Sequence, residues 1–210
     1  MTTNHVTRVV VTGSESTGKT TLARDLAKHF GTSWVAEQSR VYAEKVGRSL
    51  NAEDVSPIAS AQIAAEDAAM VEARRRGDHW VFYDTDLIST VVYARHYYGS
   101  CPSWIVAEAQ ARRAELYLLG DTDIPWVPDA VRDRPLSRDE LHNDFRNALK
   151  EFDVRVCQVR GLKERRLTAA LKCVASEPAH RKRGLKRHWS SSGQESSRGS
   201  VGIARRRRRR

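Results

Sequence analysis

Short runs of β-branched and aromatic residues alternate along the chain with longer segments in which apolar residues recur every three or four positions. The short runs predict five strands, at residues 8–12, 34–35, 80–83, 116–119 and 154–159. The longer segments predict helices, at residues 19–29, 40–46, 56–76, 87–98, 103–114, 137–152 and 163–175. Strands that alternate with helices are typical of a parallel sheet covered on both faces. The pattern therefore predicts an α/β fold built on a five-stranded parallel sheet.

The composition fits one soluble globular domain. The chain has 210 residues, of which 40% are hydrophobic and 30% charged, and no apolar run is long enough for a transmembrane helix. No basic region precedes a long apolar run at the N-terminus, so we expect no secretory signal. The three cysteines are widely spaced and form no CxxC pair, which argues against a disulfide framework or a zinc site. The sequence therefore predicts a protein of the reducing cytoplasm that has no membrane partner.

The positive charge is concentrated at the C-terminus. The formal net charge is +10, and residues 176–210 contain twelve of the 36 Lys and Arg residues but only two of the 26 Asp and Glu residues. Residues 1–175 are therefore formally neutral, and we expect them to form the folded domain. Residues 176–210 have few large apolar side chains and are expected to be a disordered basic tail. The arginines at 205–210 would bind any polyanion non-specifically; the alternatives are a solvated arm or a non-native extension.

A phosphate-binding motif follows the first predicted strand. The sequence GSESTGKT matches GxxxxGK[ST] at every fixed position, between a β-branched strand and an amphipathic helix. Glycines let the backbone N–H groups wrap around phosphates, and the helix adds the positive end of its dipole. Lys19 would be a catalytic cation on the β- and γ-phosphates, and the Thr20 hydroxyl would ligate Mg²⁺. The motif predicts ATP and Mg²⁺ as cofactors, with ATP bound by Gly13, Ser14, Glu15, Ser16, Thr17, Gly18, Lys19 and Thr20.

Acidic residues follow two further predicted strands. Asp84 comes directly after four apolar residues, and an acid at the carboxyl end of a parallel strand can hold Mg²⁺ or accept a proton. Asp86 could face the acceptor of the phosphoryl group; alternatively, either acid caps the next helix. Glu37 and Arg40 follow the strand at 34–35, where they could bind a sugar hydroxyl and a phosphate, unless they form a surface ion pair.

A long connection at residues 121–135 mixes prolines, acids and arginines ahead of a predicted helix. Small-molecule kinases exclude water during transfer, and a mobile lid can do this. Arg132, as a catalytic residue, and Arg134 could move onto the phosphates and offset the charge of the transferring group. The alternative is a structured surface loop in which these arginines pair with neighbouring aspartates.

Four segments of the chain resemble the ribosylnicotinamide kinase family, the kinase domain of NadR-like proteins. They read GSESTGKTTLARDLAKHF, WVAEQSRVYAEKVG, VFYDTD and LYLLGDTDIPWVPDAVR, and the resemblance covers residues 6–174. It implies a P-loop kinase fold, a three-layer sandwich around the parallel sheet. It also implies transfer of the ATP γ-phosphoryl group to the 5′-hydroxyl of nicotinamide riboside, which gives nicotinamide mononucleotide for NAD salvage.

The resemblance also implies a role for individual residues. The donor loop extends to Thr21, and Asp84 and Asp86 correspond to the two acids of the DTD motif. Of these two, we expect Asp84, at the strand end, to be the catalytic base or Mg²⁺ ligand and Asp86 to hold the acceptor; the alternative is that the two roles are exchanged. The residues implied for acceptor binding and for the lid are Glu37, Arg40, Asp86, Asp129 and Arg132. Ala36 stands where some members have an aromatic residue that stacks on the nicotinamide ring, and the nearest aromatic residue is Trp34. The expected acceptor is nicotinamide riboside; the alternatives are a P-loop kinase for another nucleoside or metabolite, and a nucleotide-dependent nucleic-acid-binding ATPase.

Overall fold

The five predicted strands form one parallel sheet. The computed structural model describes residues 5–124 and 138–177. Its strands lie in the order β2-β3-β1-β4-β5, and all four neighbouring pairs are parallel. Their bounds are Thr7–Thr12 for β1, Trp34–Val35 for β2, Trp80–Asp84 for β3, Leu116–Gly120 for β4 and Val156–Val159 for β5. The predicted α/β fold with a five-stranded parallel sheet is therefore confirmed.

Helices connect these strands and cover the sheet. They are α1 (Lys19–Phe30), α2 (Gln38–Val46), α3 (Val55–Arg76), α4 (Leu87–Tyr98), α5 (Ser103–Ala111), α6 (Arg138–Glu151) and α7 (Glu164–Ala175). A short 3-10 helix, η1 (Ala52–Asp54), precedes α3. Each helix that the apolar periodicity predicts is present, and only the ends differ, by a few residues.

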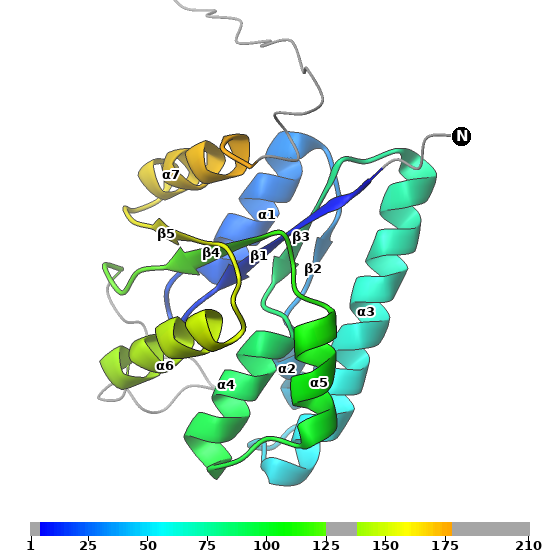
Figure 1. Ribbon diagram of the computed structural model, residues 1–210, viewed down its shortest axis with the longest axis vertical. Helices are drawn as coiled ribbons and strands as arrows, with labels where there is room; N and C mark the ends of the chain where they lie inside the picture. Colours follow the sequence, from blue (N-terminus) through cyan, green and yellow to red (C-terminus); the bar gives the residue numbers. More distant parts are fainter. Residues whose placement is uncertain (1–4, 125–137, 178–210) are drawn as a thin grey trace, which may run out of the picture.

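The sheet lies between two layers of helices (Figure 1). Helices α1 and α7 cover one face, and α3, α4, α5 and α6 cover the other. Side chains of each strand alternate between the layers: Val10 of β1 packs with the α3–α6 side, whereas Val9 and Val11 pack with α1 and α7. Strands β3 and β4 are buried along their whole length. Burial on both faces explains why residues 80–83 of β3 and 116–119 of β4 are continuously hydrophobic.

Helix α3 is preceded by a capping box around Asn51. The Asn51 side chain accepts a hydrogen bond from Glu53 N at 2.9 Å, and Asp54 Oδ2 accepts one from Asn51 N at 2.9 Å. The Arg48 guanidinium binds both oxygens of the same carboxylate, at 2.7 and 2.9 Å, and this pairing lowers the pKa of Asp54 to about 2. The segment between α2 and α3 is therefore held in a defined turn.

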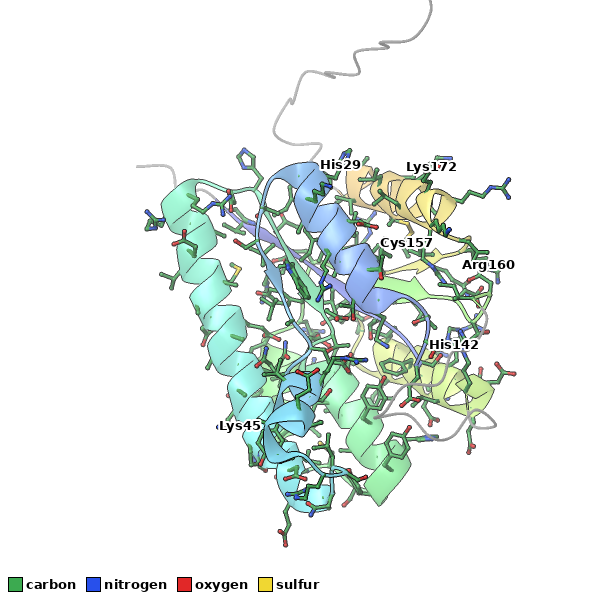
Figure 2. The ribbon with its side chains drawn as sticks, turned by 180° about the vertical axis from the view of Figure 1, so that it is seen from behind. His29, Lys45, His142, Cys157, Arg160 and Lys172 are labelled. Atoms are coloured by element: carbon green, nitrogen blue, oxygen red, sulfur yellow. A yellow bond between two sulfur atoms is a disulfide. The ribbon has the colours of Figure 1, made fainter. Side chains whose placement is uncertain are left out.

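A disulfide joins Cys157 and Cys173, although the sequence pattern argues against one. Cys157 lies on β5, and Figure 2 labels it on the sheet next to α7, which carries Cys173. The Cα atoms of the two residues are 6.1 Å apart because α7 packs back along the strand that precedes it. The prediction that no disulfide forms is wrong, since spacing in the sequence does not reveal this tertiary approach. The cytoplasmic location stays a prediction.

The described fold continues past residue 175, where the sequence analysis ends the folded domain. Arg155 Nη1 lies 3.0 Å from Glu177 Oε2, and Arg155 Nη2 donates to Ser176 O at 3.2 Å. Glu177 is buried, so Ser176 and Glu177 close the end of α7. The remaining residues of the predicted tail lie outside the described residues. Within residues 5–124 and 138–177, no helix has the length and apolar character needed to cross a membrane.

We expect deletion of residues 178–210 to leave the thermal unfolding midpoint nearly unchanged, because the segment has few core-forming side chains. Deletion of residues 176–210 should lower the midpoint by about 2–4 °C, because it also removes the buried Glu177 carboxylate that binds Arg155. Both deletions should abolish salt-sensitive binding to heparin. Calorimetry of the two truncated proteins measures both unfolding midpoints. A large drop of the midpoint on deletion of residues 178–210 would contradict the expectation and show that this segment packs on the domain.

Candidate active site

The phosphate-binding motif forms the turn between β1 and α1. Gly13 has φ +131°, and Gly18, the residue before α1, has φ +74°, both in the region that favours glycine. A Cβ atom at Gly13 would lie 3.0 Å from the carbonyl oxygen of Gly120, and one at Gly18 would lie 3.1 Å from Ile124 Cδ1. The two glycines therefore let the loop curl at the N-terminus of α1 while it packs against the end of β4.

Lys19 and Thr20, the first two residues of α1, reach different partners. The buried Lys19 ammonium donates to the carbonyl oxygen of Ser14 at 2.9 Å, across the loop. The Thr20 hydroxyl donates to Asp84 Oδ2 at 2.6 Å. Strands β1 and β3 are neighbours, with Val11 paired to Asp84, so the end of β3 lies next to the loop. The structure thus brings together the predicted catalytic lysine and the two predicted metal ligands.

Thr20 and Asp84 fit a Mg²⁺ site. Hydroxyl and carboxylate oxygens are hard ligands, and Mg²⁺ is usually held by one or two protein oxygens together with waters and substrate phosphates. The described part of the chain contains no cluster of three or more His, Cys, Asp or Glu side chains that could hold a metal. The pair is therefore suited to a cation that arrives with a nucleotide.

Arg138, which the sequence analysis did not single out, contacts the phosphate loop from the first residue of α6. Its guanidinium donates to Ile124 O at 2.8 Å and to Ser16 O at 3.3 Å, and burial lowers its pKa. Ser16 has φ +54°, which is uncommon for a residue with a side chain. Arg138 therefore connects the strained part of the loop to the segment after β4. The signal in the sequence was a base at a helix N-terminus, where the helix dipole disfavours positive charge.

The start of the predicted lid is anchored to the region around α7. Arg166 donates to Asp123 Oδ1 at 2.8 Å, and Gly161 N donates to Asp123 Oδ2 at 2.6 Å. Arg160, labelled in Figure 2 beyond the end of β5, pairs with Asp121. The predicted lid residues that lie outside the described residues are Asp129, Arg132 and Arg134. Their roles stay predictions.

A cavity of about 690 Å³ adjoins the phosphate loop, between α2, α3 and α4. Its wall includes the carboxylates of Glu15 in the loop and Glu37 before α2, and the guanidinium of Arg40. Helix α4 adds three tyrosines, Tyr93, Tyr97 and Tyr98. The volume is in the usual range for small-molecule sites, and the mixture of aromatic and polar groups is typical of them.

Glu37 and Arg40 face this cavity. Glu37 is buried, and the Ser39 hydroxyl donates to its Oε1 at 3.0 Å. Arg40 Nε lies 4.0 Å from Glu37 Oε2. Burial of the carboxylate does not fit the alternative of a simple surface ion pair. The two residues therefore present a carboxylate and a guanidinium to the space beside the loop.

Asp86 is buried and is not part of the cavity wall. Its Oδ1 accepts a hydrogen bond from Ser89 N at 3.2 Å, as the N-cap of α4, and its Oδ2 accepts one from the Tyr117 hydroxyl at 2.7 Å. Burial raises its pKa. These contacts favour the alternative in which Asp86 caps the helix, and its role in acceptor binding stays a prediction.

A second buried acid, Glu66 of α3, belongs to the same region. Gln62 Nε2 donates to Glu66 Oε1 at 2.8 Å and to Thr85 O at 3.4 Å. Thr85 has φ +68°, a strained conformation for a β-branched residue. Burial, together with the charge of Asp86, raises the pKa of Glu66 to about 8. The Gln62 amide thus supports the strained residue that follows Asp84.

Trp34, the aromatic residue closest in sequence to the predicted acceptor site, lies on the opposite face of the sheet. It packs with the α1 side of the core, and the Arg24 guanidinium lies 4.7 Å from its ring centroid. The α4 tyrosines line the cavity instead, and the stacked rings of Tyr93 and Tyr97 have centroids 6.2 Å apart. The signal in the sequence that could have indicated these tyrosines is their i, i+4 spacing in the helix after the DTD sequence, which places both rings on one face of that helix.

We expect Glu66→Gln to flatten the pH dependence of stability. The unfolded wild-type chain releases this proton near pH 4.5, whereas the folded protein keeps it until about pH 8. The stability linked to the proton is therefore complete below pH 4.5 and is lost as the pH rises to about 8. Urea unfolding at several pH values in this interval measures how the free energy of unfolding changes with pH. Glu140→Gln is the control, because it changes an exposed glutamate. An unchanged slope in the Glu66 variant would contradict the buried, protonated state.

Comparison with known proteins identifies relatives of this chain. The family model described as an AAA domain matches residues 8–166. The trifunctional NAD biosynthesis/regulator protein NadR of Escherichia coli strain K12 is 30% identical over 151 residues, which make up 70% of this chain and 35% of that protein. The chain therefore spans about a third of the length of this curated relative.

Solved structures give the same result. NadR in complex with NR superimposes with a TM-score of 0.64 at 26% identity, over 82% of this chain and 49% of that chain. The deoxyadenosine kinase of M. mycoides with bound dATP has a TM-score of 0.54 at 12% identity, over 81% of this chain and 100% of that chain, which shows the fold alone. The predicted similarity to NadR is confirmed, and the chain belongs to the AAA domain family of P-loop proteins.

Proposed function

We propose that this chain transfers the γ-phosphoryl group of ATP to the 5′-hydroxyl of nicotinamide riboside. The observation that carries the proposal is the cavity beside the phosphate loop, because a kinase must hold its acceptor within reach of the γ-phosphate. The identity to NadR supports the acceptor. In the reaction, the acceptor oxygen bonds to the γ-phosphorus, the bond from that phosphorus to ADP breaks, and the hydroxyl proton is released.

The donor would bind to the phosphate loop. The backbone N–H groups of residues 13–21 would surround the phosphates. Lys19 would exchange its contact with the Ser14 carbonyl for the β- and γ-phosphates, since hydrogen bonds to charged oxygens are the stronger ones. Thr20 and Asp84 would hold Mg²⁺. When bound, Mg²⁺ neutralises charge on the phosphates during transfer.

The acceptor would occupy the cavity. Glu37 and Arg40 would bind the ribose hydroxyls of the acceptor. An acceptor without these hydroxyls would bind less well, because the buried Glu37 carboxylate would then have no hydrogen-bond donor from the ligand. The rings of Tyr93 and Tyr97 would attract the cationic nicotinamide ring, with a gain of about 0.5–2 kcal/mol. These side chains supply the aromatic contact that Trp34 does not provide.

The segment that follows β4 would supply a further positive charge next to the phosphates. We assign Arg132 to the transferring group and Asp129 to the acceptor side. The segment begins near Asp123, which is bound by Arg166, and it ends at Arg138, which contacts the phosphate loop. Ile124, which follows Asp123, approaches Gly18 of the loop, so residues on both sides of the segment lie next to the loop, which supports a role for the segment in the reaction.

We expect Lys19→Ala to lower kcat/KM by about 100-fold or more, because it removes the cation assigned to the β- and γ-phosphates. The fold should persist, as judged by circular dichroism. Lys28→Ala, at an exposed lysine in the last turn of α1, is the matched control and should keep wild-type activity. Turnover of the Lys19 variant at the wild-type rate would contradict the donor-side assignment.

We expect nicotinamide riboside to exceed uridine, cytidine and adenosine in kcat/KM by about tenfold or more in a coupled ADP-release assay. Glu37→Gln should erode this preference while leaving the KM for ATP nearly unchanged, because Glu37 lines the cavity and not the loop. Glu140→Gln serves as the control. If a standard nucleoside proves the better acceptor by about tenfold, the acceptor is wrong and a kinase for another nucleoside takes its place.

A further inference from the structure

The strand-end acids that the sequence predicts for the acceptor do not line the cavity. Asp86 accepts hydrogen bonds from Ser89 and Tyr117, and Asp84 accepts one from Thr20. Among the described residues, the carboxylates in the cavity wall are those of Glu15, Glu37 and Glu44. Only Glu15 belongs to the phosphate loop, so it is the carboxylate at the junction between the loop and the cavity.

Glu15 is held in the cavity wall by a tyrosine of α4. The Tyr97 hydroxyl donates to Glu15 Oε1 at 3.0 Å, between residues 82 apart in the sequence. Glu15 is only 9% exposed. A buried carboxylate that is already hydrogen-bonded has a defined orientation before a ligand binds, which is how a preorganised site reduces the cost of binding.

The charge of Glu15 also argues against a contact with ATP. Phosphates in such loops are surrounded by backbone N–H groups and by the lysine. A carboxylate placed among them would repel the negative oxygens. The side chain of Glu15 therefore belongs on the side away from the phosphates, and its hydrogen bond to Tyr97 holds it there, in the cavity wall.

We propose that Glu15 is an acceptor-binding residue, whose carboxylate accepts a hydrogen bond from the hydroxyl that receives the phosphoryl group. Tyr97 is the positioning residue that aims this carboxylate. The inference rests on the proposed function, in which the cavity holds a hydroxyl-bearing acceptor beside ATP. It gives the loop two separate tasks, because its backbone binds the donor and one of its side chains orients the acceptor.

The charges of the cavity wall indicate the class of acceptor. Besides the three carboxylates, the wall contains the guanidiniums of Arg40 and Arg48. Arg48 donates through both terminal nitrogens to the Asp54 carboxylate, whose negative charge offsets the positive charge of the guanidinium. The excess of negative charge disfavours a phosphate group in this space. The cavity therefore suits a neutral or cationic nucleoside rather than a nucleoside monophosphate.

The test compares Glu15→Gln and Tyr97→Phe with two control variants. Glu140→Gln changes an exposed glutamate, and Tyr83→Phe removes a buried hydroxyl that has no hydrogen-bond partner among the described residues. Acceptor kinetics are measured with nucleosides and their monophosphates, and each variant is then assayed with the best wild-type acceptor. The Kd of MgATP is measured separately, by equilibrium binding of a fluorescent ATP analogue in the absence of acceptor.

We expect Glu15→Gln to lower kcat/KM for the acceptor by about 10- to 100-fold, with the Kd for the ATP analogue within about twofold of wild type. Tyr97→Phe should have a smaller effect in the same direction, about three- to tenfold, and no further effect in the Glu15→Gln background. Both controls should match the wild type. If Glu15→Gln does not fold, Tyr97→Phe decides the question, because it removes only the hydroxyl that aims the carboxylate.

The outcomes separate this inference from the proposed function. If Glu15→Gln weakens binding of the ATP analogue and leaves the acceptor kinetics unchanged, Glu15 acts on the donor side and the inference is overturned. The proposal that nicotinamide riboside is the acceptor is not affected by that result. If the wild type prefers another nucleoside and Glu15→Gln shows the same selective loss, the acceptor proposed above is wrong and the inference holds. A preference for a monophosphate overturns the acceptor class, and no turnover of any acceptor overturns both proposals.

Discussion

The pairing of β1 with β3 brings the two halves of the site together. Val11 pairs with Asp84, and Thr85 N donates to Val11 O at 3.0 Å, so both strands end at the same edge of the sheet. The phosphate loop leaves β1 toward α1 on one face, whereas α4 follows β3 on the other face. Neighbouring strands whose helices diverge leave a crevice at their carboxyl ends. Because of this one register, the phosphate loop, the Thr20–Asp84 pair and the α4 tyrosines all lie near this crevice.

The acids around this crevice show how environment separates side chains of the same type. Asp84, Asp86 and Glu66 are all buried. Asp84 accepts a hydrogen bond from Thr20 beside the phosphate loop, and burial raises the pKa values of Asp86 and Glu66. Such burial is costly unless hydrogen bonds compensate, and Gln62 and Tyr117 provide them. The network also supports the left-handed residue between the two aspartates. Asp86 and Glu66 therefore help to hold the end of β3, whereas Glu15 and Glu37, which are also buried, belong to the cavity wall.

Sequence reasoning predicted the phosphate loop better than the cavity beside it. Lys19 and Thr20 are adjacent in the chain, and the strand and helix around them follow from local patterning, so the structure brings them into the expected loop. The cavity beside the loop lies between three helices, and its aromatic residues come from α4 instead of from Trp34. Arg138 lies 122 residues from the loop residue that it contacts. Contacts of this kind depend on how the helices pack and leave little local pattern.

The sequence by itself determined the strands, the helices and the phosphate loop of this protein, because hydrophobic periodicity and glycine positions act over a few neighbouring residues. Only the tertiary structure decided which acids reach the cavity. Asp86, two residues from Asp84, is buried as the cap of α4, and Glu15 is held in the cavity wall by a hydrogen bond from Tyr97 of α4. The disulfide between β5 and α7 likewise exists because two elements pack together. The direction of a side chain is set by its packing partners, and residues far apart in the chain supply those partners.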